Sequence, residues 1–355
     1  MAGGNYVTQF EDFKPSGRTV NGRRVGFGVD LDGCVDMGME KHLLAFGAAS
    51  VCHFGLQPIQ NVAMKAWMYV NFFSMDRGVS RFVTLYKWAD IVNSTRAASS
   101  LGLSAPDFKY LRRWASFTSA LSPEALSAFI ESGNAAPILS KGESAESAFE
   151  ELSSVLEWSG RVDALVPEAT AHMRAFPNAV AAIQEGYSRG VDYAIVSGTP
   201  QSHIETMAVK YGIADCLEAL WGQQAGRKSH ALATMMIGPL KREELEAAIE
   251  RKRPLLETRP AQYDVLTMVG DSPKDNAERE KANLALSGNK EAPIRMRFIP
   301  VEAENDAWGL LREDLDAVVS GEWSLERERQ LIQEGLSKLD VAWQESPVYA
   351  FGGND

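Results

Sequence analysis

Four short apolar runs, separated by segments with helical spacing, constrain the fold of this chain more than any other feature. Each run ends at a turn or an acidic residue, as expected of buried strands. The runs are Arg24–Asp30, Val191–Ser197, Asp264–Gly270 and Ile294–Pro300. Helical stretches are expected between them at Asn178–Arg189, Gln201–Tyr211, Lys228–Met236, Arg242–Arg251 and Lys274–Asn283. Strands alternating with helices predict an α/β fold with a Rossmann-like parallel sheet.

The region between the first two runs has a different pattern. From about Gly38 to His172 it is helical and rich in aromatic residues, without a convincing strand. We interpret it as an all-helical cap domain inserted into the α/β core. We expect domains at 21–36 plus 174–355 (core) and 37–173 (cap), an N-terminal tail at 1–20, and an amphipathic helix over Glu304–Asp340. The aromatic residues are expected to form the cap's own core: Trp67, Tyr69, Phe72, Phe73, Phe82, Tyr86, Trp88, Tyr110, Trp114 and Phe117.

The composition limits the classes of function. Hydrophobic residues make up 45% of the 355 residues and charged residues 23%, as in soluble globular enzymes. A formal net charge of -11 disfavours binding to nucleic acid or to an anionic membrane. Met1–Val20 lacks the apolar core of a signal peptide, and no apolar run approaches the roughly 18 residues of a membrane helix. We therefore expect a cytoplasmic protein, and the sequence does not indicate its oligomeric state.

The first segment with chemical potential is Val29-Asp30-Leu31-Asp32-Gly33-Cys34-Val35. Side chains two residues apart on a strand point the same way, so Asp30 and Asp32 are expected to converge at the strand's end. Two converging carboxylates suit Mg²⁺, a hard cation that prefers oxygen ligands. The alternative is a turn in which aspartate caps the following segment.

Two further segments offer groups that bind oxyanions. Ser197-Gly198-Thr199 follows the second run, where a hydroxyl and backbone N–H groups form a cradle at a helix start. Lys228 follows a loop, Gly222–Arg227, and can neutralise a phosphate. The alternatives are an ordinary turn with an N-cap and a surface lysine.

The fourth segment, Val269-Gly270-Asp271-Ser272-Pro273-Lys274-Asp275, again places an acid at a strand's end. Asp271 is a candidate metal ligand, and Asp275 is a candidate to orient Lys228 or to support the metal from behind. The alternative for Asp271 is an N-cap, since Pro273 suits a first helical turn.

Taken in order, the four segments resemble the four motifs of the haloacid dehalogenase-like superfamily. These motifs are DxDG(T/V), a strand-end Ser/Thr, a Lys and GDxxxD. The resemblance covers about Gly22–Val35 and Asn178–Pro300, and the helical insertion falls where that superfamily places its type-1 caps. Cys34 departs from the motif's usual Thr; we interpret it as a packed thiol.

The resemblance implies a Mg²⁺-dependent phosphohydrolase acting on a small phosphorylated metabolite. It implies that Asp30 attacks phosphorus, that Asp32 is the general acid/base, and that Ser197 and Lys228 hold the phosphoryl oxygens with Gly198 and Thr199 beside them. It also implies a metal site formed by Asp30, the Asp32 carbonyl and Asp271. A carboxylate nucleophile and a second carboxyl that shuttles the proton agree with the general chemistry of phosphoryl transfer.

Other functions remain open at this point. A phosphomutase would use the same two aspartates, and a ligand-binding module on this fold would need neither. A dehalogenase or a phosphonate hydrolase is disfavoured by Asp32. In the cap, Arg77 and Arg81 flank a glycine turn and are candidates to bind the substrate's distal group; a solvated helix end is the alternative.

Overall fold

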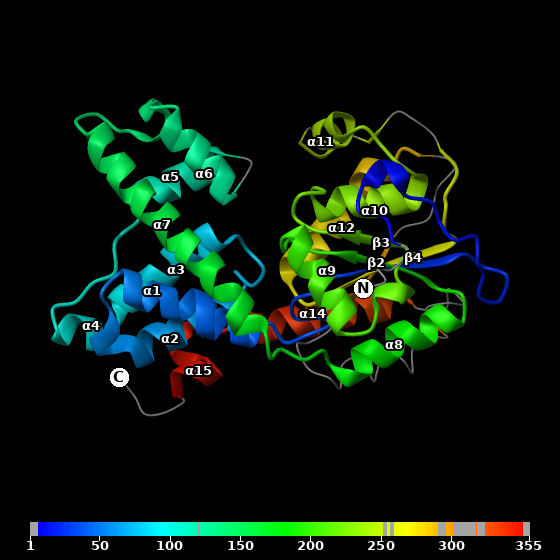
Figure 1. Ribbon diagram of the computed structural model, residues 1–355, viewed down its shortest axis with the longest axis horizontal. Helices are drawn as coiled ribbons and strands as arrows, with labels where there is room; N and C mark the ends of the chain where they lie inside the picture. Colours follow the sequence, from blue (N-terminus) through cyan, green and yellow to red (C-terminus); the bar gives the residue numbers. More distant parts are fainter. Residues whose placement is uncertain are drawn as a thin grey trace. The chain divides into compact units, whose positions relative to one another are not determined.

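The computed structural model describes residues 6–118, 121–250, 254–255, 259–289, 296–300, 317 and 324–350. The chain forms two compact units (Figure 1). The α/β unit comprises Met1–Met37 and Arg174–Leu336, and the helical unit comprises Gly38–Met173 and Ser337–Asp355. Among the described residues, no helix has the length and apolar character needed to cross a membrane.

The α/β unit is built on a parallel sheet of five strands in the order β3-β2-β1-β4-β5. Their bounds are β1 Val25–Val29, β2 Asp192–Val196, β3 Ala219–Trp221, β4 Val265–Gly270 and β5 Arg297–Pro300. Every residue of β1, β2 and β4 is buried, as expected of a parallel sheet covered on both faces. The strand order reverses between β1 and β4, the place where open α/β sheets bind ligands beyond the strands' carboxyl ends.

Helices cover both faces of this sheet, and Figure 1 shows α8 and α10 on opposite sides of it. Apolar residues of β2, β3 and β4 form one core with α10 and α12. On the other face, Tyr193 of β2 donates from its hydroxyl to Ala182 O of α8 (3.3 Å). The helices of the unit are α8 Pro177–Ser188, α9 Gln201–Lys210, α10 Lys228–Ile237, α11 Arg242–Glu250, α12 Pro273–Leu286 and the short 3₁₀ helices η1 Phe10–Asp12 and η6 Ala214–Cys216. Most of α14 Leu325–Leu339 also belongs to it, and the last three residues of that helix belong to the helical unit.

The helical unit contains no strand among its described residues. Two of its segments, η2 Lys41–Gly47 and η4 Tyr69–Phe73, are π-helical. Its other elements are α1 Ala48–His53, η3 Gln57–Ile59, α2 Gln60–Met68, α3 Arg81–Ser94, α4 Arg96–Ser100, α5 Lys109–Phe117, α6 Pro123–Glu131, η5 Ala136–Ile138, α7 Ala145–Thr170, η7 Trp343–Glu345 and α15 Pro347–Ala350.

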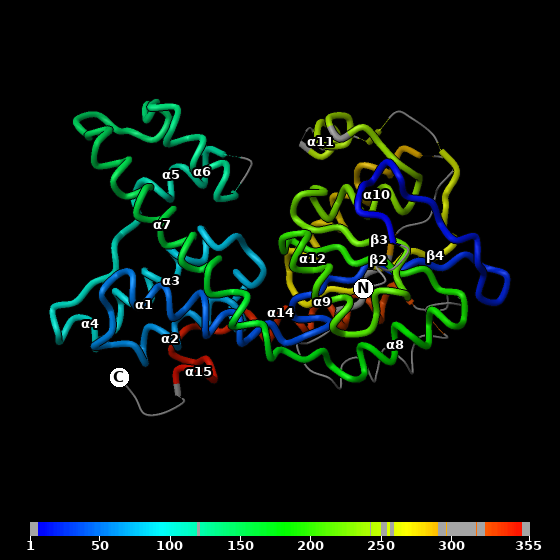
Figure 2. Tube along the Cα trace, viewed as in Figure 1, coloured from blue at the N-terminus to red at the C-terminus, as the bar shows by residue number. Residues whose placement is uncertain are grey.

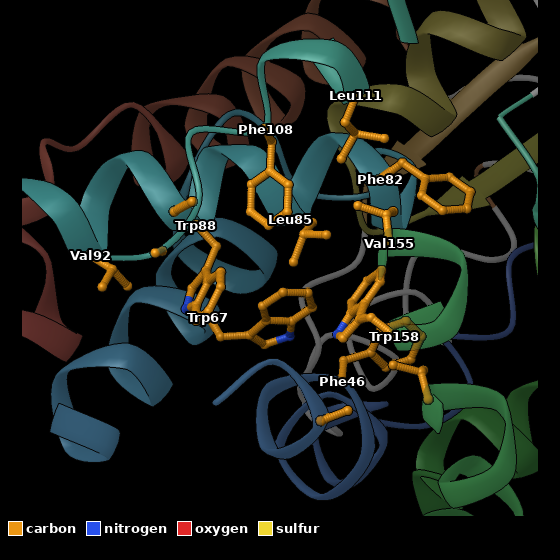
Figure 3. Close-up of a cluster of buried hydrophobic side chains, with 14 of the residues drawn as sticks. Phe46, Trp67, Phe82, Leu85, Trp88, Val92, Phe108, Leu111, Val155 and Trp158 are labelled. Atoms are coloured by element: carbon orange, nitrogen blue, oxygen red, sulfur yellow. The ribbon is translucent and has the colours of Figure 1, made fainter. Parts of the chain in front are cut away.

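Tryptophan side chains form the centre of the helical unit (Figure 3). The ring of Trp67 lies 6.0 Å from that of Trp88 and 6.2 Å from that of Trp158. The indole of Trp88 donates to Ala63 O (2.8 Å) and that of Trp158 to Ser50 Oγ (3.0 Å), so these polar groups are satisfied inside the core. The interpretation of the aromatic residues as the unit's own core is confirmed for seven of the ten, which form this cluster or pack against it: Trp67, Tyr69, Phe82, Tyr86, Trp88, Tyr110 and Trp114. Phe72 and Phe73 are not part of the cluster, and Phe117 is 59% exposed.

The units differ from the expected domains at both ends of the chain. The N-terminal segment is not a separate tail, because Val7 pairs with β3 and Phe13 is buried in the α/β unit. The segment from Ser337 belongs to the helical unit, where the Tyr69 hydroxyl donates to Val341 O (2.6 Å) and Trp343 joins the core. Part of the helix expected over Glu304–Asp340 is α14; residues 304–316 and 318–323 lie outside the described residues, as do residues 251, 294 and 295 of two other predicted elements.

Candidate active site

Side chains pack closely against the two glycines of strand β1. A Cβ on Gly28 would lie 2.9 Å from Leu232 Cδ2 of α10, and one on Gly26 would lie 3.0 Å from the Tyr263 ring. Asp30 follows the strand and is 7% exposed. Its N–H donates to Val269 O of β4 (3.0 Å), and its Oδ1 accepts from the Leu31 N–H (2.9 Å). The first acid is thus fixed at the carboxyl end of the sheet.

The end of β4 brings two more carboxylates to the same place. Asp271 follows β4, and Asp275 lies in the first turn of α12, where it forms a capping box with Ser272. Carboxylate oxygens of Asp30, Asp271 and Asp275 all lie within 4.8 Å of one another. These three acids therefore form one cluster.

Lys228 is the first residue of α10 and points into this cluster. Its Nζ lies 2.5 Å from Asp30 Oδ2 and 2.6 Å from Asp275 Oδ1. Lys228 thus pairs directly with two of the three carboxylates. The charge of Lys274 also acts on Asp30 and Asp275, so the cluster has a second ammonium group nearby.

The protonation of these groups reflects burial and mutual charge. Burial raises the pKa of Asp30 well above its usual range; Lys228 opposes this, and the charges of Asp275 and Asp271 add to it. Burial alone would lower the pKa of Lys228, but Asp275 and Asp30 outweigh it and raise that pKa. For Asp275, burial is outweighed by Lys228, which lowers the pKa of the carboxyl. Lys228 is therefore a fixed cation beside Asp275.

Asp32 has a hydroxyl partner. Gly33 has φ +81°, and its N–H donates to Asp36 O (2.8 Å), which closes a tight turn after Asp32. The half-buried Asp32 accepts through Oδ2 from Thr199 Oγ1 at 2.5 Å. Thr199 was predicted as a substrate contact, and its bond to Asp32 is a relation that sequence spacing does not reveal.

The turn after β2 supplies the second hydroxyl. Ser197 is buried, its N–H donates to Trp221 O of β3 (2.9 Å), and its Oγ accepts from the Thr199 N–H (3.1 Å). Gly198 between them is exposed. Ser197, Gly198 and Thr199 thus form a turn at the start of α9, linked through Thr199 to Asp32.

The two arginines considered as substrate ligands belong to the helical unit. Arg81 begins α3; its guanidinium donates to Asp163 (2.7 Å) and Ser159 (3.1 Å) and lies 5.2 Å from the Phe46 ring centre. Arg77 is half-buried, and its N–H donates to Ser74 O (3.0 Å). Arg81 therefore has a structural role within its own unit.

A magnesium ion suits the donor set at the ends of β1 and β4. The cluster offers only oxygen ligands, which this hard cation prefers. The charges of Asp271 and Asp275 raise the pKa of Asp30, so a bound cation would favour the ionised form of that carboxyl. The residues thus fit the metal that the resemblance implies.

Comparison with known proteins gives similarities to solved structures alone. No protein family and no curated protein matches the sequence. A haloacid dehalogenase-like family hydrolase from Streptococcus pneumoniae is 13% identical, with 82% of this chain and 91% of that chain covered and a TM-score of 0.32. A β-phosphoglucomutase from a hyperthermophilic Pyrococcus species is 13% identical, with coverages of 79% and 87% and a TM-score of 0.36. An L-2-haloacid dehalogenase from Xanthobacter autotrophicus is 12% identical, with coverages of 83% and 84% and a TM-score of 0.28.

The superpositions are loose. The fold assignment accordingly rests on the strand order, and the chemistry of the site rests on its own side chains.

Proposed function

We propose that this chain, which resembles haloacid dehalogenase-like proteins, is a Mg²⁺-dependent phosphohydrolase acting on a small phosphorylated metabolite. The observation that carries the proposal is that two neighbouring acids have different partners. Asp30 lies in a buried cluster with Lys228, whereas Asp32 is hydrogen-bonded to a hydroxyl. One carboxylate is thereby suited to attack, and the other to carry a proton.

In the proposed first step, a carboxylate oxygen of Asp30 forms a bond to phosphorus as the bond to the leaving oxygen breaks. Asp32 gives its proton to that oxygen, so an alcohol leaves and an aspartyl phosphate remains. In the second step, Asp32 takes a proton from water, whose oxygen attacks phosphorus and releases Asp30 and inorganic phosphate. Thr199 holds the carboxyl of Asp32 in one orientation throughout.

Groups around the nucleophile would stabilise the negative charge on the phosphoryl oxygens. Lys228 supplies a permanent cation, and the hydroxyl of Ser197 and the backbone of Gly198 supply donors. Asp30, Asp271 and the Asp32 carbonyl would hold Mg²⁺, with Asp275 beside them. When bound, the metal neutralises negative charge on the substrate.

The alternative within the same chemistry is a phosphomutase. It would use Asp30 and Asp32 in the same roles but would return the phosphoryl group to a second hydroxyl. Release of inorganic phosphate in amounts equal to the alcohol formed separates the hydrolase from the mutase. A protein that only binds ligand would release neither.

The test is turnover of an aryl phosphate by the purified chain and two variants. Asp30→Asn is expected to abolish turnover, and Asp32→Asn to slow it by about 10²–10⁴-fold, the usual effect of losing a general acid/base. Asp215→Asn, which changes an exposed acid of the α/β unit, serves as the matched control and should behave as the unmodified protein. Circular dichroism checks that each variant is folded.

Metal dependence is measured with the same assay. Chelation should eliminate turnover, Mg²⁺ should restore it, and Ca²⁺ should restore it poorly because its coordination is larger and less regular. Full turnover in metal-free buffer, or an Asp30→Asn variant that keeps most of its activity, would refute the mechanism.

We also propose that Arg77 and Arg81 contact the distal part of the natural substrate. For Arg81 this requires sharing the guanidinium with Asp163 and Ser159.

A further inference from the structure

Two loops at the carboxyl edge of the sheet are tied together by glutamine side chains. One is the turn Ser197–Pro200 after β2, and the other is the loop Gly222–Arg227 between β3 and Lys228. The proposed chemistry uses hydroxyls of the first and the ammonium group that follows the second. It assigns no role to the glutamines between them.

Gln201, the first residue of α9, uses both ends of its amide. Its Oε1 accepts from the Gly222 N–H at 2.7 Å. Its Nε2 donates to Leu220 O at 2.9 Å and to Glu205 Oε1 at 3.0 Å. The side chain thus holds the backbone on both sides of Trp221, at the point where β3 becomes the loop.

Two more hydrogen bonds join the same segments. The Gln201 N–H donates to Gln224 Oε1 at 2.8 Å. The Gln223 N–H donates to Thr199 O at 2.9 Å. Each loop therefore fixes the backbone of the other.

The contact between the loops is also sterically close. A Cβ on Gly222 would lie 2.8 Å from the Gln201 Cα, the Gln201 N and the Thr199 O. All three are backbone atoms, which have little room to move aside. The loop can approach the turn this closely only because Gly222 lacks a side chain.

The loop ends at Lys228, whose Nζ must stay near Asp30 and Asp275. A shift of the loop at Gly222 moves the start of α10 and with it the lysine. Misplacement of a charged group by about 1 Å can cost on the order of 10²-fold in rate.

We propose that Gln201, assisted by Gln224, is a positioning residue. It holds the loop before Lys228 at a fixed position relative to the turn that carries Ser197. It touches neither substrate nor metal and acts through Lys228. This role rests on the proposed phosphohydrolase function.

The test is a double-mutant cycle on kcat/KM for an aryl phosphate. Gln201→Leu removes the amide and keeps much of the side chain's bulk; it is expected to lower kcat/KM by about 10- to 100-fold. In a Lys228→Met background the same change should lower kcat/KM by less than about threefold, because the effects of two residues that act as a unit are not additive.

Gln184→Leu is the matched control. Gln184 is exposed in α8, and its Nε2 donates to a single backbone oxygen, Gly212 O, at 3.1 Å. Its loss should leave kcat/KM within about twofold, as for an ordinary surface change. If Gln201→Leu does not fold, Gln224→Ala replaces it in the cycle, since Gln224 is exposed.

The outcomes separate this inference from the function on which it rests. Equal effects of Gln201→Leu and Gln184→Leu in an active enzyme would overturn the positioning role alone. The positioning role would also be overturned if Gln201→Leu lowered kcat/KM by the same factor in the presence of Lys228 and in the Lys228→Met background. If the unmodified chain releases no phosphate in Mg²⁺, both the function and the positioning role fail.

Discussion

At the scale of single residues, glycine decides how closely the charged groups of the site approach one another. A Cβ on Gly270 would lie 2.4 Å from Asp275 Cβ and 2.9 Å from its Oδ2. Any other residue at that position would push Asp275 away from Lys228. Gly270 therefore allows Asp275 to lie beside Lys228.

Cys34 lies four residues after the proposed nucleophile, and its sulfur is expected to be inert. The residue is fully buried, and burial together with the charges of Asp271, Asp30 and Asp275 raises the pKa of its thiol. Iodoacetamide at pH 8 should therefore modify the exposed Cys52 first. Modification of Cys34 should be at least about 100-fold slower, since a local opening that costs about 3 kcal/mol exposes roughly 1% of molecules.

Mass spectrometry of proteolytic peptides, taken over time, measures the modification at each cysteine. Unfolding in denaturant before alkylation is the control, because all thiols should then react at similar rates. Native Cys34 reacting as fast as Cys52 would show that the thiol is accessible and would contradict its interpretation as a packed group.

At the scale of elements, the N-terminal segment covers the edge of the sheet at β3 and packs against α10. Val7 donates to Glu218 O (3.0 Å) and accepts from the Leu220 N–H (2.9 Å), so it covers the outer edge of β3. Figure 2 shows this segment, in blue, beside α10. Phe10 packs its ring 5.0 Å from Trp221 and 4.4 Å from His230.

Phe10→Ala should destabilise the α/β unit by about 3 kcal/mol, the lower end of the range for truncating a buried phenylalanine. The reason is that Phe10 is 5% exposed and fills the space between β3 and α10. Denaturant titration followed by fluorescence gives the free energy of unfolding. Val209→Ala, in the same unit and 49% exposed, should change it by less than about 0.5 kcal/mol. Equal effects of the two changes would mean that the N-terminal segment is not part of the core.

How much of this architecture the sequence predicts depends on the length of each element. Strands β1, β2 and β4 are continuous apolar runs, and α10 begins at the predicted Lys228, so these were predicted. Strand β3 has three residues, too few to show a pattern, and it was missed.

The pairing of Val7 with that strand could not be predicted either, because the N-terminal segment is polar and has no strand pattern. The residues of the site could be proposed from their positions at strand ends. The bonds of Thr199 to Asp32 and of Gln201 to Gly222 could not, since they join side chains and backbone distant in sequence.

At the scale of the whole molecule, the chain is acidic and also gathers carboxylates at one edge of its sheet. The formal net charge is -11, and three carboxylates lie together at the sheet edge, two of them paired with Lys228. Without a bound metal ion, repulsion among these acids reduces the stability of the fold, a cost that functional sites commonly carry. Stability and metal binding should therefore be linked.

Mg²⁺ at 100 times its dissociation constant should stabilise the folded protein by about 2.7 kcal/mol and raise its thermal midpoint by roughly 5–10 °C. Asp271→Asn removes one repelling charge and one ligand. Its midpoint without metal should therefore equal or exceed that of the unmodified chain, and its rise with Mg²⁺ should largely disappear. Asp215→Asn, an exposed change in the same unit, should keep the full rise. Thermal scans by circular dichroism with and without Mg²⁺ measure both quantities. An undiminished rise in Asp271→Asn would place the cation elsewhere and remove Asp271 from the metal site.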